Sequence, residues 1–489
     1  MPSLGTTQPE ETLDPQDWPA MRALGHRMLD DMFDYLEHLR DGPVWQPLPE
    51  EVRERFRSPL PLEPEGAEQA YADFKRDVLP YNLGNTHPRF WGWVMGPGTV
   101  VGMLAELLAA AINPNLGGGD HAPNYVEAQV LDWCKTMVGF PPEASGVLVS
   151  GGATANLIAL TIARQAKAGF DVRRQGLQQA PRRLMVYCSQ ETHNSNQKMV
   201  ELLGLGSDSL RLIPVDHDFR VEVGALEQAI AADRAAGHLP ICVIGCAATT
   251  NTGSIDDLPR LAEICQREGL WFHVDGAFGA LAALDPETAP LVAGMERADS
   301  LAFDLHKWFY LPFDIGVTLT RHAQQHLDTF ALHAAYLTHS GARGIAAGRH
   351  WFTEYSFETS RRFRALKAWM VIKAHGSRQL GRLVRQNVEQ ARYLGALVDQ
   401  ASDLENLAPV ALNVVNFRFK AGNLDDEALN RLNDELLIRL HESGVAAPSL
   451  TNVRGQSAIR VAITNHRSRR EDFDLLIHEV QRLGHDLLQ

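Results

Sequence analysis

From residue 146 onward, short β-rich runs alternate with longer segments whose apolar residues recur at helical spacing. This alternation is typical of a mainly parallel sheet with helices on both of its faces. The carboxyl ends of parallel strands meet at one edge of such a sheet, and ligands bind there. The residues that follow each strand are therefore the candidates for function. The predicted strands are residues 146–149, 184–188, 241–247, 271–274, 300–303 and 315–319, and the predicted helices are residues 155–167, 223–235 and 258–268.

The segments before this region predict a helical arm. Residues 21–39 have the apolar spacing of an amphipathic helix, and residues 41–64 are rich in proline and charge, which indicates an extended connection. Such an arm has little core of its own and is expected to lie against another surface, such as a partner subunit. Residues 100–112 are apolar but interrupted by Glu106, and they are too short to span a bilayer, so we expect a buried helix.

The segments after it predict a smaller α/β domain. A long helix is expected to begin near Ser360 and to run to His375 and Gly376. The later predicted strands are residues 414–419 and 458–463, and the later helices are residues 425–443 and 470–487. The chain is thereby divided into an N-terminal arm, a large domain and a small C-terminal domain, at residues 1–85, 86–376 and 377–489.

Composition excludes several classes of protein. At 489 residues the chain exceeds one compact core, and its formal net charge of −14 argues against a nucleic-acid or anionic-membrane surface. Residues 1–17 are polar and lack the apolar segment of a signal peptide. The five cysteines are sparse and odd in number, which favours reduced core residues over a disulfide framework or a zinc site. We expect a cytoplasmic protein with no metal centre.

Two of the predicted strands are followed by residues suited to one cofactor. Asp275 follows the run that ends at Val274, and Lys307 lies just beyond Phe303, next to a histidine and a tryptophan. A lysine can condense with an aldehyde, and a carboxylate can pair with a protonated pyridine nitrogen. These are the two groups that pyridoxal 5'-phosphate (PLP) requires of a protein. Taken singly, Lys307 could be a surface lysine and Asp275 the first residue of a loop.

A glycine turn follows the first predicted strand. Gly151 and Gly152 precede Thr154 and an apolar helix. Glycines let a backbone approach an anion closely, and a helix N-terminus offers free N–H groups and a favourable dipole. The same residues would also form an ordinary strand-to-helix turn, and their spacing matches neither the dinucleotide fingerprint nor the Walker pattern. A single phosphate group fits better than a dinucleotide.

His193 and Thr250 follow two further strands of the predicted sheet. A neutral imidazole at His193 could stack on a flat heteroaromatic ring and later bond a substrate carboxylate, and Thr250 supplies a hydroxyl at the same edge. Taken alone, His193 would more often be a structural histidine, and the run around Thr250 a polar turn.

These motifs belong to a longer, ordered set. From Met21 to the C-terminus, the chain resembles the group II PLP-dependent amino-acid decarboxylases, and most of all the aromatic-L-amino-acid decarboxylases. The resemblance rests on residues 86–90 (Thr-His-Pro-Arg-Phe), 150–154 (Ser-Gly-Gly-Ala-Thr), 192–193 (Thr-His), 273–277 (His-Val-Asp-Gly-Ala), 298–308 (Ala-Asp-Ser to His-Lys-Trp), 336–340 (Tyr-Leu-Thr-His-Ser), 361–367 (Arg-Arg-Phe-Arg-Ala-Leu-Lys) and 460–463 (Arg-Val-Ala-Ile).

The resemblance implies an α/β fold of PLP fold type I, the aspartate-aminotransferase-like fold, and a role for individual residues. Lys307 would hold PLP through its amine, Asp275 would bind the ring nitrogen, and His193 would stack on the ring. Tyr336, in a glycine-rich segment suited to a mobile lid, would donate the proton that replaces the departing carbon dioxide. Further cofactor contacts would come from Ala153, Thr154, Thr250, Ala277, Asp304 and His306, and the substrate pocket would include His87, Phe90, Trp91, Gly96 and Phe313.

The implied activity is decarboxylation of an L-amino acid, with an aromatic side chain favoured, to its amine and carbon dioxide. The implied assembly is a homodimer whose active sites are shared between subunits. Oxidation to an aldehyde, decarboxylation of a non-aromatic amino acid such as glutamate, and transamination remain alternatives. A non-catalytic paralogue is disfavoured because Lys307, Asp275 and His193 are intact.

The chain departs from the family pattern in two places. Asp304 and Leu305 stand where the family often has asparagine and proline. Residues 113–120, which would form one wall of the substrate pocket, are more polar and glycine-rich than the aromatic wall that the resemblance implies. The second departure leaves the substrate side chain open.

Overall fold

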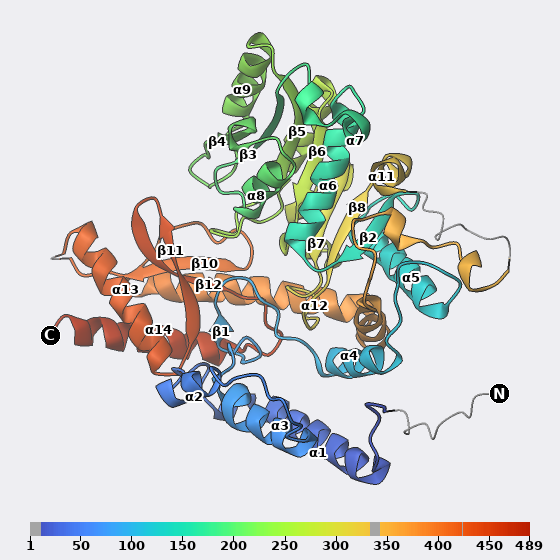
Figure 1. The fold of residues 1–489 in the computed structure, drawn as a ribbon. Coiled ribbons are helices and arrows are strands. Elements are labelled where there is room, and N and C mark those ends of the chain that lie inside the picture. Colours follow the sequence, from blue (N-terminus) through green and yellow to red (C-terminus); the bar gives the residue numbers. More distant parts are fainter. Residues whose placement is uncertain (1–10, 333–342, 423) are drawn as a thin grey trace, which may run out of the picture.

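The computed structural model describes residues 11–332, 343–422 and 424–489 (Figure 1). A sheet domain lies at the top of Figure 1, a second sheet domain lies at its lower left, and the N-terminal helices lie beneath them. Tyr336, and with it most of the predicted lid, falls outside the described residues. Within the described ranges, no helix has the length and apolar content that crossing a membrane requires.

The larger sheet has seven strands in the order β2-β8-β7-β6-β5-β3-β4. Strands β4, β3, β5, β6 and β7 are parallel, whereas β8 is antiparallel to both of its neighbours. The predicted mainly parallel sheet is therefore confirmed. Its strands are β2 (Ser145–Val149), β3 (Leu184–Ser189), β4 (Leu210–Ile213), β5 (Leu239–Cys246), β6 (Trp271–Asp275), β7 (Ser300–Asp304) and β8 (Gly316–Thr320).

Both faces of this sheet are buried. In β2, Val147 and Val149 pack in the core beneath α6 (Gly152–Lys167), whereas Leu148 lies in the opposite core, as the two-residue period of a strand requires. Burial on both faces explains why these strands read as continuous apolar runs. One face is covered by α6, α7 (Val172–Gln175) and α8 (Ser195–Leu202), and the other by α5 (Ala122–Met137), α9 (Val223–Ala235) and α10 (Leu258–Glu268); α11 (Ala323–Phe330) packs against α6.

The second sheet has five strands in the order β1-β11-β12-β10-β9. Its edge strand β1 comes from early in the chain and pairs in parallel with β11, with Phe90 opposite Ala447. The remaining pairs are antiparallel, and α13 (Asp426–Glu442) and α14 (Arg470–Leu487) pack on this sheet. The strands are β1 (Phe90–Trp91), β9 (Leu404–Asn406), β10 (Val414–Phe419), β11 (Ala447–Val453) and β12 (Gln456–Ala462).

The long helix α12 (Ala365–Gln400) connects the two sheet domains, as Figure 1 shows in orange. Its path breaks at Gly376, whose φ of 72° lies in the left-handed region that glycine adopts without strain. The helix end predicted at this glycine is therefore a break within a longer helical segment.

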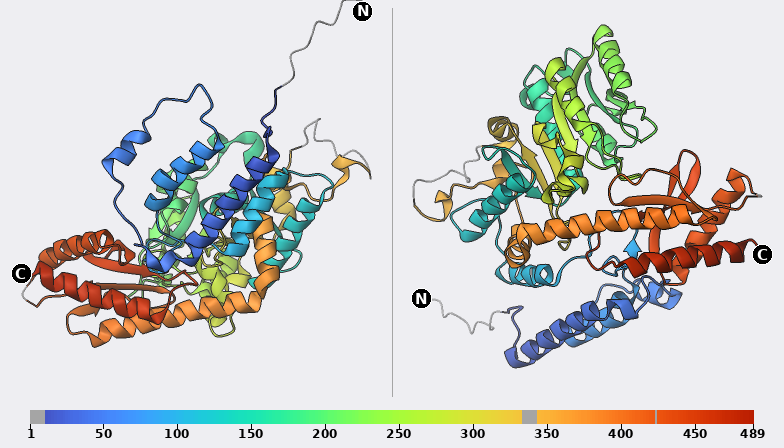
Figure 2. Two further views of the ribbon diagram at one scale, coloured as in Figure 1. Left: turned by 90° about the horizontal axis from the view of Figure 1, so that it is seen from below. Right: turned by 180° about the vertical axis from the view of Figure 1, so that it is seen from behind.

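The N-terminal helices form an outlying layer, best seen in Figure 2. Only Leu24 of α1 (Trp18–Glu37) is buried. The layer also contains α2 (Glu50–Arg55), α3 (Ala67–Asp73) and a π-helical turn (Phe74–Val78). Short 3₁₀ turns occur at Leu39–Asp41, Leu79–Tyr81, Leu177–Gln179, Ser207–Ser209, Gly279–Leu284, Ala289–Val292, Met295–Arg297, Ile345–Ala347 and Phe352–Glu354.

Helix α4 (Val100–Ile112) forms where residues 100–112 were predicted to be helical, but the prediction that it is buried is wrong for the single chain. Leu107 and Ile112 are 57% and 62% exposed. Only Gly102 and Ala105 are buried, because α4 contacts α12 on one side and no element of the described chain covers the other.

Candidate active site

Five strands of the large sheet end at one cavity of about 190 Å³. Lys307 and Asp275 both line it, together with His193 and the residues around the glycine turn. Residues as far apart in sequence as Gly152 and Lys307 meet here because the carboxyl ends of parallel strands share one edge. The full lining is Trp93, Val94, Gly152, Ala153, Asn156, His193, Ser195, Cys246, Ala248, Thr249, Thr250, Asp275, Ala277 and Lys307.

Asp275 is a buried carboxylate that receives three hydrogen bonds. Asn156 and Asn196 each donate a side-chain N–H to its Oδ2 at 2.9 Å, and the backbone N–H of Ala277 donates to Oδ1 at 3.2 Å. No lysine, arginine or histidine of the described chain forms an ion pair with it, although burying an unpaired charge is costly. The cavity therefore offers a fixed negative charge to a cationic ligand.

Lys307 lies across this cavity with a different carboxylate as its partner. Its Nζ is 2.8 Å from Asp304 Oδ2, and His306 Nε2 is 3.8 Å from the same oxygen. Asp304 is almost completely buried, and its Oδ1 has no hydrogen-bond partner in the described chain. Asp304 and His306 thus lie behind Lys307 and do not line the cavity itself.

The glycine turn brings the start of α6 against Asp304. A Cβ atom at Gly152 would lie 2.9 Å from Asp304 Oδ2, closer than real Cβ contacts allow. No side chain caps this end of α6, and Ser150 Oγ and Thr154 Oγ1 are 2.9 Å apart beside it. The free N–H groups of such a helix end favour an anion.

His193 is held as a neutral ring. The backbone N–H of Ser195 donates to its Nδ1 at 3.2 Å, and Ser195 Oγ is 2.8 Å from the same atom. Because Nδ1 accepts, the ring proton is on Nε2. Burial lowers the pKa of His193 below its ordinary value, which also favours the neutral form.

None of the five residues predicted for the substrate pocket lines the Lys307 cavity. Trp91 points into the small domain, where it stacks on Phe473 with ring centroids 5.0 Å apart, and Phe90 packs beside Val44 and Ala447. Gly96 and Phe313 line a separate, mostly apolar pocket next to α1.

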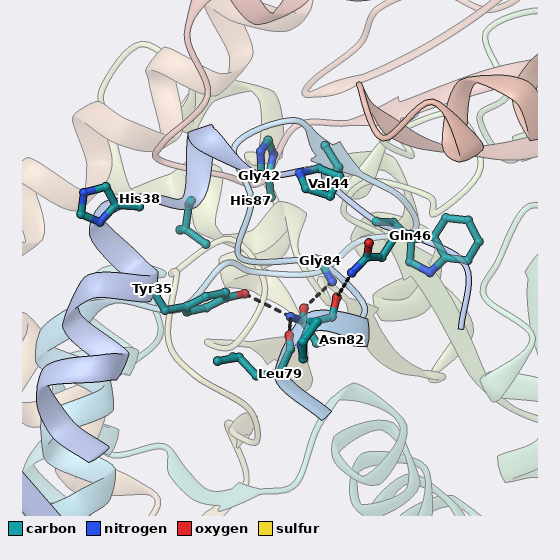
Figure 3. Close-up of a pocket in the computed structure, with 13 residues that line it drawn as sticks. Tyr35, His38, Gly42, Val44, Gln46, Leu79, Asn82, Gly84 and His87 are labelled. Atoms are coloured by element: carbon teal, nitrogen blue, oxygen red, sulfur yellow. Dashed lines mark hydrogen bonds between the residues drawn. The ribbon is translucent and has the colours of Figure 1, made fainter. Parts of the chain in front are cut away.

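His87 lies in yet another cavity, of about 380 Å³, at the base of the N-terminal helices (Figure 3). Its ring lies beside Gly42 and Val44, and Tyr35 and Asn82 line another part of the same cavity, where Asn82 donates to the carbonyl oxygen of Leu79 at 2.7 Å. Burial lowers the pKa of His87 to about 4, so the ring is neutral. Phe90 and Trp91 lie away from the Lys307 cavity because strand β1 joins the small-domain sheet. Gly96 and Phe313 do not line that cavity either, although the backbone N–H of Gly96 donates to the carbonyl oxygen of His306 at 3.2 Å and the ring of Phe313 lies 4.4 Å from that of His306.

Trp93 and Val94 line the Lys307 cavity in their place. The chain turns at Trp93, whose φ is 49°, and its backbone is held by Ser449 and Arg460 of the small domain. Asn156 and Asn196 were also missed. One signal pointed to Asn156, which stands four residues after Gly152 and therefore on the same face of α6.

A sequence model of the pyridoxal-dependent decarboxylase conserved domain matches residues 49–420. The chain belongs to this family. Among known relatives, it is 32% identical over 471 residues to the aromatic-L-amino-acid decarboxylase of Bacillus atrophaeus, which covers 96% of each chain. It is 27% identical to the phenylacetaldehyde synthase of Arabidopsis thaliana, covering 97% of this chain and 99% of that one.

The fold is also that of a solved relative. The crystal structure of Oryza sativa TDC with PLP and tryptamine superposes with a TM-score of 0.89 at 24% identity, covering 98% of this chain and 100% of that one. The fold is thus PLP fold type I, and the protein is a PLP-dependent amino-acid decarboxylase. The cavity suits this cofactor: Asp275 offers an unpaired buried charge, Lys307 an amine, and the start of α6 an anion site.

Proposed function

We propose that this protein decarboxylates an aromatic L-amino acid to its amine, with PLP held by Lys307. The observation that carries the proposal is the buried carboxylate of Asp275, which faces the same cavity as Lys307 and has no cation of its own. When bound, PLP supplies a protonated ring that accepts the electrons of the breaking bond to the carboxylate.

The chain's own residues then have distinct tasks. Asp275 keeps the ring nitrogen protonated, and the turn at Ala153 and Thr154 binds the phosphate. Asp304 orients the amine of Lys307. His193 and Ala277 hold the two faces of the ring, with Thr250 at its edge and His306 behind the lysine. Tyr336 delivers the proton that replaces the carboxylate.

An aromatic substrate is favoured by the walls of the cavity. Trp93 and Val94 line it, and an indole can stack on another aromatic ring. A relative with 32% identity acts on aromatic amino acids by name, and another structure holds tryptamine. Aldehyde formation is the second candidate, because a relative of full length is a phenylacetaldehyde synthase.

We also propose a cytoplasmic homodimer. The exposed apolar side chains of α4 and the largely unburied α1 would be covered by a second copy, with residues 1–85 wrapping the partner. All five cysteines are buried and unpaired, in keeping with a reducing compartment.

Incubating the PLP-loaded protein with each of the twenty amino acids, dopa and 5-hydroxytryptophan tests the reaction. We expect carbon dioxide and one equivalent of amine from an aromatic substrate, with neither ammonia nor peroxide. Lys307→Ala should abolish turnover and the visible absorbance of bound PLP. Aldehyde with ammonia and peroxide would instead establish the oxidative reaction, and activity retained in Lys307→Ala would refute the assignment of the lysine.

A further inference from the structure

A row of buried hydrogen bonds leads from Asp275 into the sheet. Asn156 Nδ2 is 2.9 Å from Asp275 Oδ2, and Asn156 Oδ1 is 2.9 Å from His273 Nε2. On the other side of the ring, His273 Nδ1 is 2.9 Å from Ser300 Oγ, which is 2.8 Å from Trp271 Nε1. None of the four residues behind Asp275 is more than 1% exposed, so water does not enter the row.

The direction of each bond is fixed from the two ends. A carboxylate only accepts, so Asn156 presents its NH₂ group to Asp275 and its carbonyl oxygen to His273. That oxygen requires a proton on His273 Nε2. Burial lowers the pKa of His273 to about 4, so the ring is neutral and Nδ1 carries no proton.

The outer end agrees with this assignment. The indole N–H of Trp271 only donates, so Ser300 Oγ accepts from it and is free to donate its own proton to His273 Nδ1. Every bond in the row therefore donates toward Asp275. Hydrogen bonds aligned in this way polarise one another, and a carboxylate at the accepting end is stabilised in its ionised form.

We propose that Ser300, His273 and Asn156 are positioning residues that keep Asp275 ionised, and through it keep the cofactor ring nitrogen protonated. This inference rests on the proposed pairing of Asp275 with that nitrogen. The other titratable groups near Asp275 are Lys307 and His193 across the cavity, and two thiols, Cys188 and Cys246. Burial raises the pKa of both thiols, so neither supplies a charge.

Through this row of hydrogen bonds, the hydroxyl of Ser300 sets the tautomer of His273 and the orientation of Asn156. In Ser300→Ala, His273 Nδ1 is left facing the carbonyl oxygen of residue 300, at 3.2 Å, which can only accept. The ring then takes the tautomer protonated on Nδ1, and Nε2 becomes an acceptor. Asn156 must rotate to donate to Nε2, which turns its own carbonyl oxygen toward Asp275.

The test follows the ring nitrogen directly. Parent and Ser300→Ala proteins are loaded with PLP labelled with ¹⁵N in the ring, and the ¹⁵N shift is recorded against pH. We expect the ring nitrogen of Ser300→Ala to lose its proton about one pH unit lower than in the parent, as expected for one lost hydrogen bond.

Thr320→Val is the matched control. Thr320 lies opposite Ser300 in the neighbouring strand, is also buried, and donates to the carbonyl oxygen of Asp299 at 3.1 Å outside the row. In Thr320→Val, the PLP ring nitrogen should lose its proton at the same pH as in the parent.

Each result bears on one claim. Equal titration of Ser300→Ala and the parent overturns the row while leaving the proposed function intact, whereas a parent that binds no PLP overturns the proposed function. If Ser300→Ala does not fold, His273→Phe removes both ring nitrogens at similar volume. If the PLP ring nitrogen of His273→Phe loses its proton at a lower pH than in the parent, the role of the row is supported; an unchanged pH overturns it.

Discussion

At the scale of the residue, Asp304 has a clear consequence for cofactor affinity. Its carboxylate pairs with Lys307 at 2.8 Å, but its second oxygen is buried without a partner, beside the turn proposed to bind phosphate. A phosphate bound at this turn would lie near the Asp304 carboxylate, and two neighbouring negative groups repel each other. We expect Asp304→Asn to lower the dissociation constant of PLP by about tenfold, roughly 1.4 kcal/mol.

Equilibrium dialysis against PLP measures this effect, with Asp314→Asn as a control because Asp314 pairs with Arg362 and does not line the Lys307 cavity. Weaker binding by Asp304→Asn would mean that the carboxylate assists the cofactor and that the repulsion argument fails.

Single residues also mark what could be read from the sequence. Lys307 and Asp275 could be predicted because Asp275 ends one buried strand, Lys307 lies just beyond another, and strand ends share an edge. Asn156 and Asn196 could not, because their roles depend on how helices α6 and α8 sit against β6. Trp93 was missed because the direction of the preceding strand is set by β11, some 350 residues later.

At the scale of the element, α4 has an apolar face that the single chain leaves uncovered. Leu107 and Leu108 are 57% and 49% exposed on it. If a second copy buries this face, replacing both by serine should raise the dimer dissociation constant by at least tenfold, since each buried leucine contributes about 1.5–3 kcal/mol.

Sedimentation velocity over a range of concentrations measures the dimer. Leu202→Ser is the control, because Leu202 is 71% exposed on α8 of the large domain. An unchanged dimer in the double variant would show that α4 lies outside the interface.

Helix α4 also shows that the sequence pattern predicts the type of an element better than its burial. Residues 100–112 were predicted correctly as a helix because apolar content sets its type, but burial depends on what lies beside it. The central strands were predicted for the same reason. Strands β1, β4, β9 and β11 were missed, since they are short or polar; β11 carries Pro448 and Asn452, and Leu450 and Asn452 within it are exposed.

At the scale of the whole molecule, buried histidines set the response to acid. Burial lowers the pKa values of His87, His273, His326 and His466 to about 4, below the ordinary value of 6.5. Between these values the unfolded chain binds protons that the folded chain does not, so stability falls as pH falls from about 6.5 toward 4. Asp256, with its pKa raised to about 6, acts in the opposite direction, but as one group against four.

We therefore expect a lower urea midpoint at pH 5 than at pH 7. His326→Gln should reduce this difference, because it removes one of the four titrating groups. The ring of His326 forms hydrogen bonds with Ser145 and with the carbonyl oxygen of Tyr355. A midpoint that is independent of pH across this range would contradict the linkage.

The pairing of β1 with β11 also has a consequence for biosynthesis. Phe90 finds its partner Ala447 only after nine-tenths of the chain has left the ribosome. At roughly 5–20 residues per second, the intervening synthesis lasts on the order of tens of seconds. Throughout that time Phe90 and Trp91 have no partner strand, because β11 and the core of the small domain have not yet been synthesised. The nascent chain thus exposes an apolar segment that can aggregate until translation is nearly finished, unless a chaperone binds it or the large domain buries it.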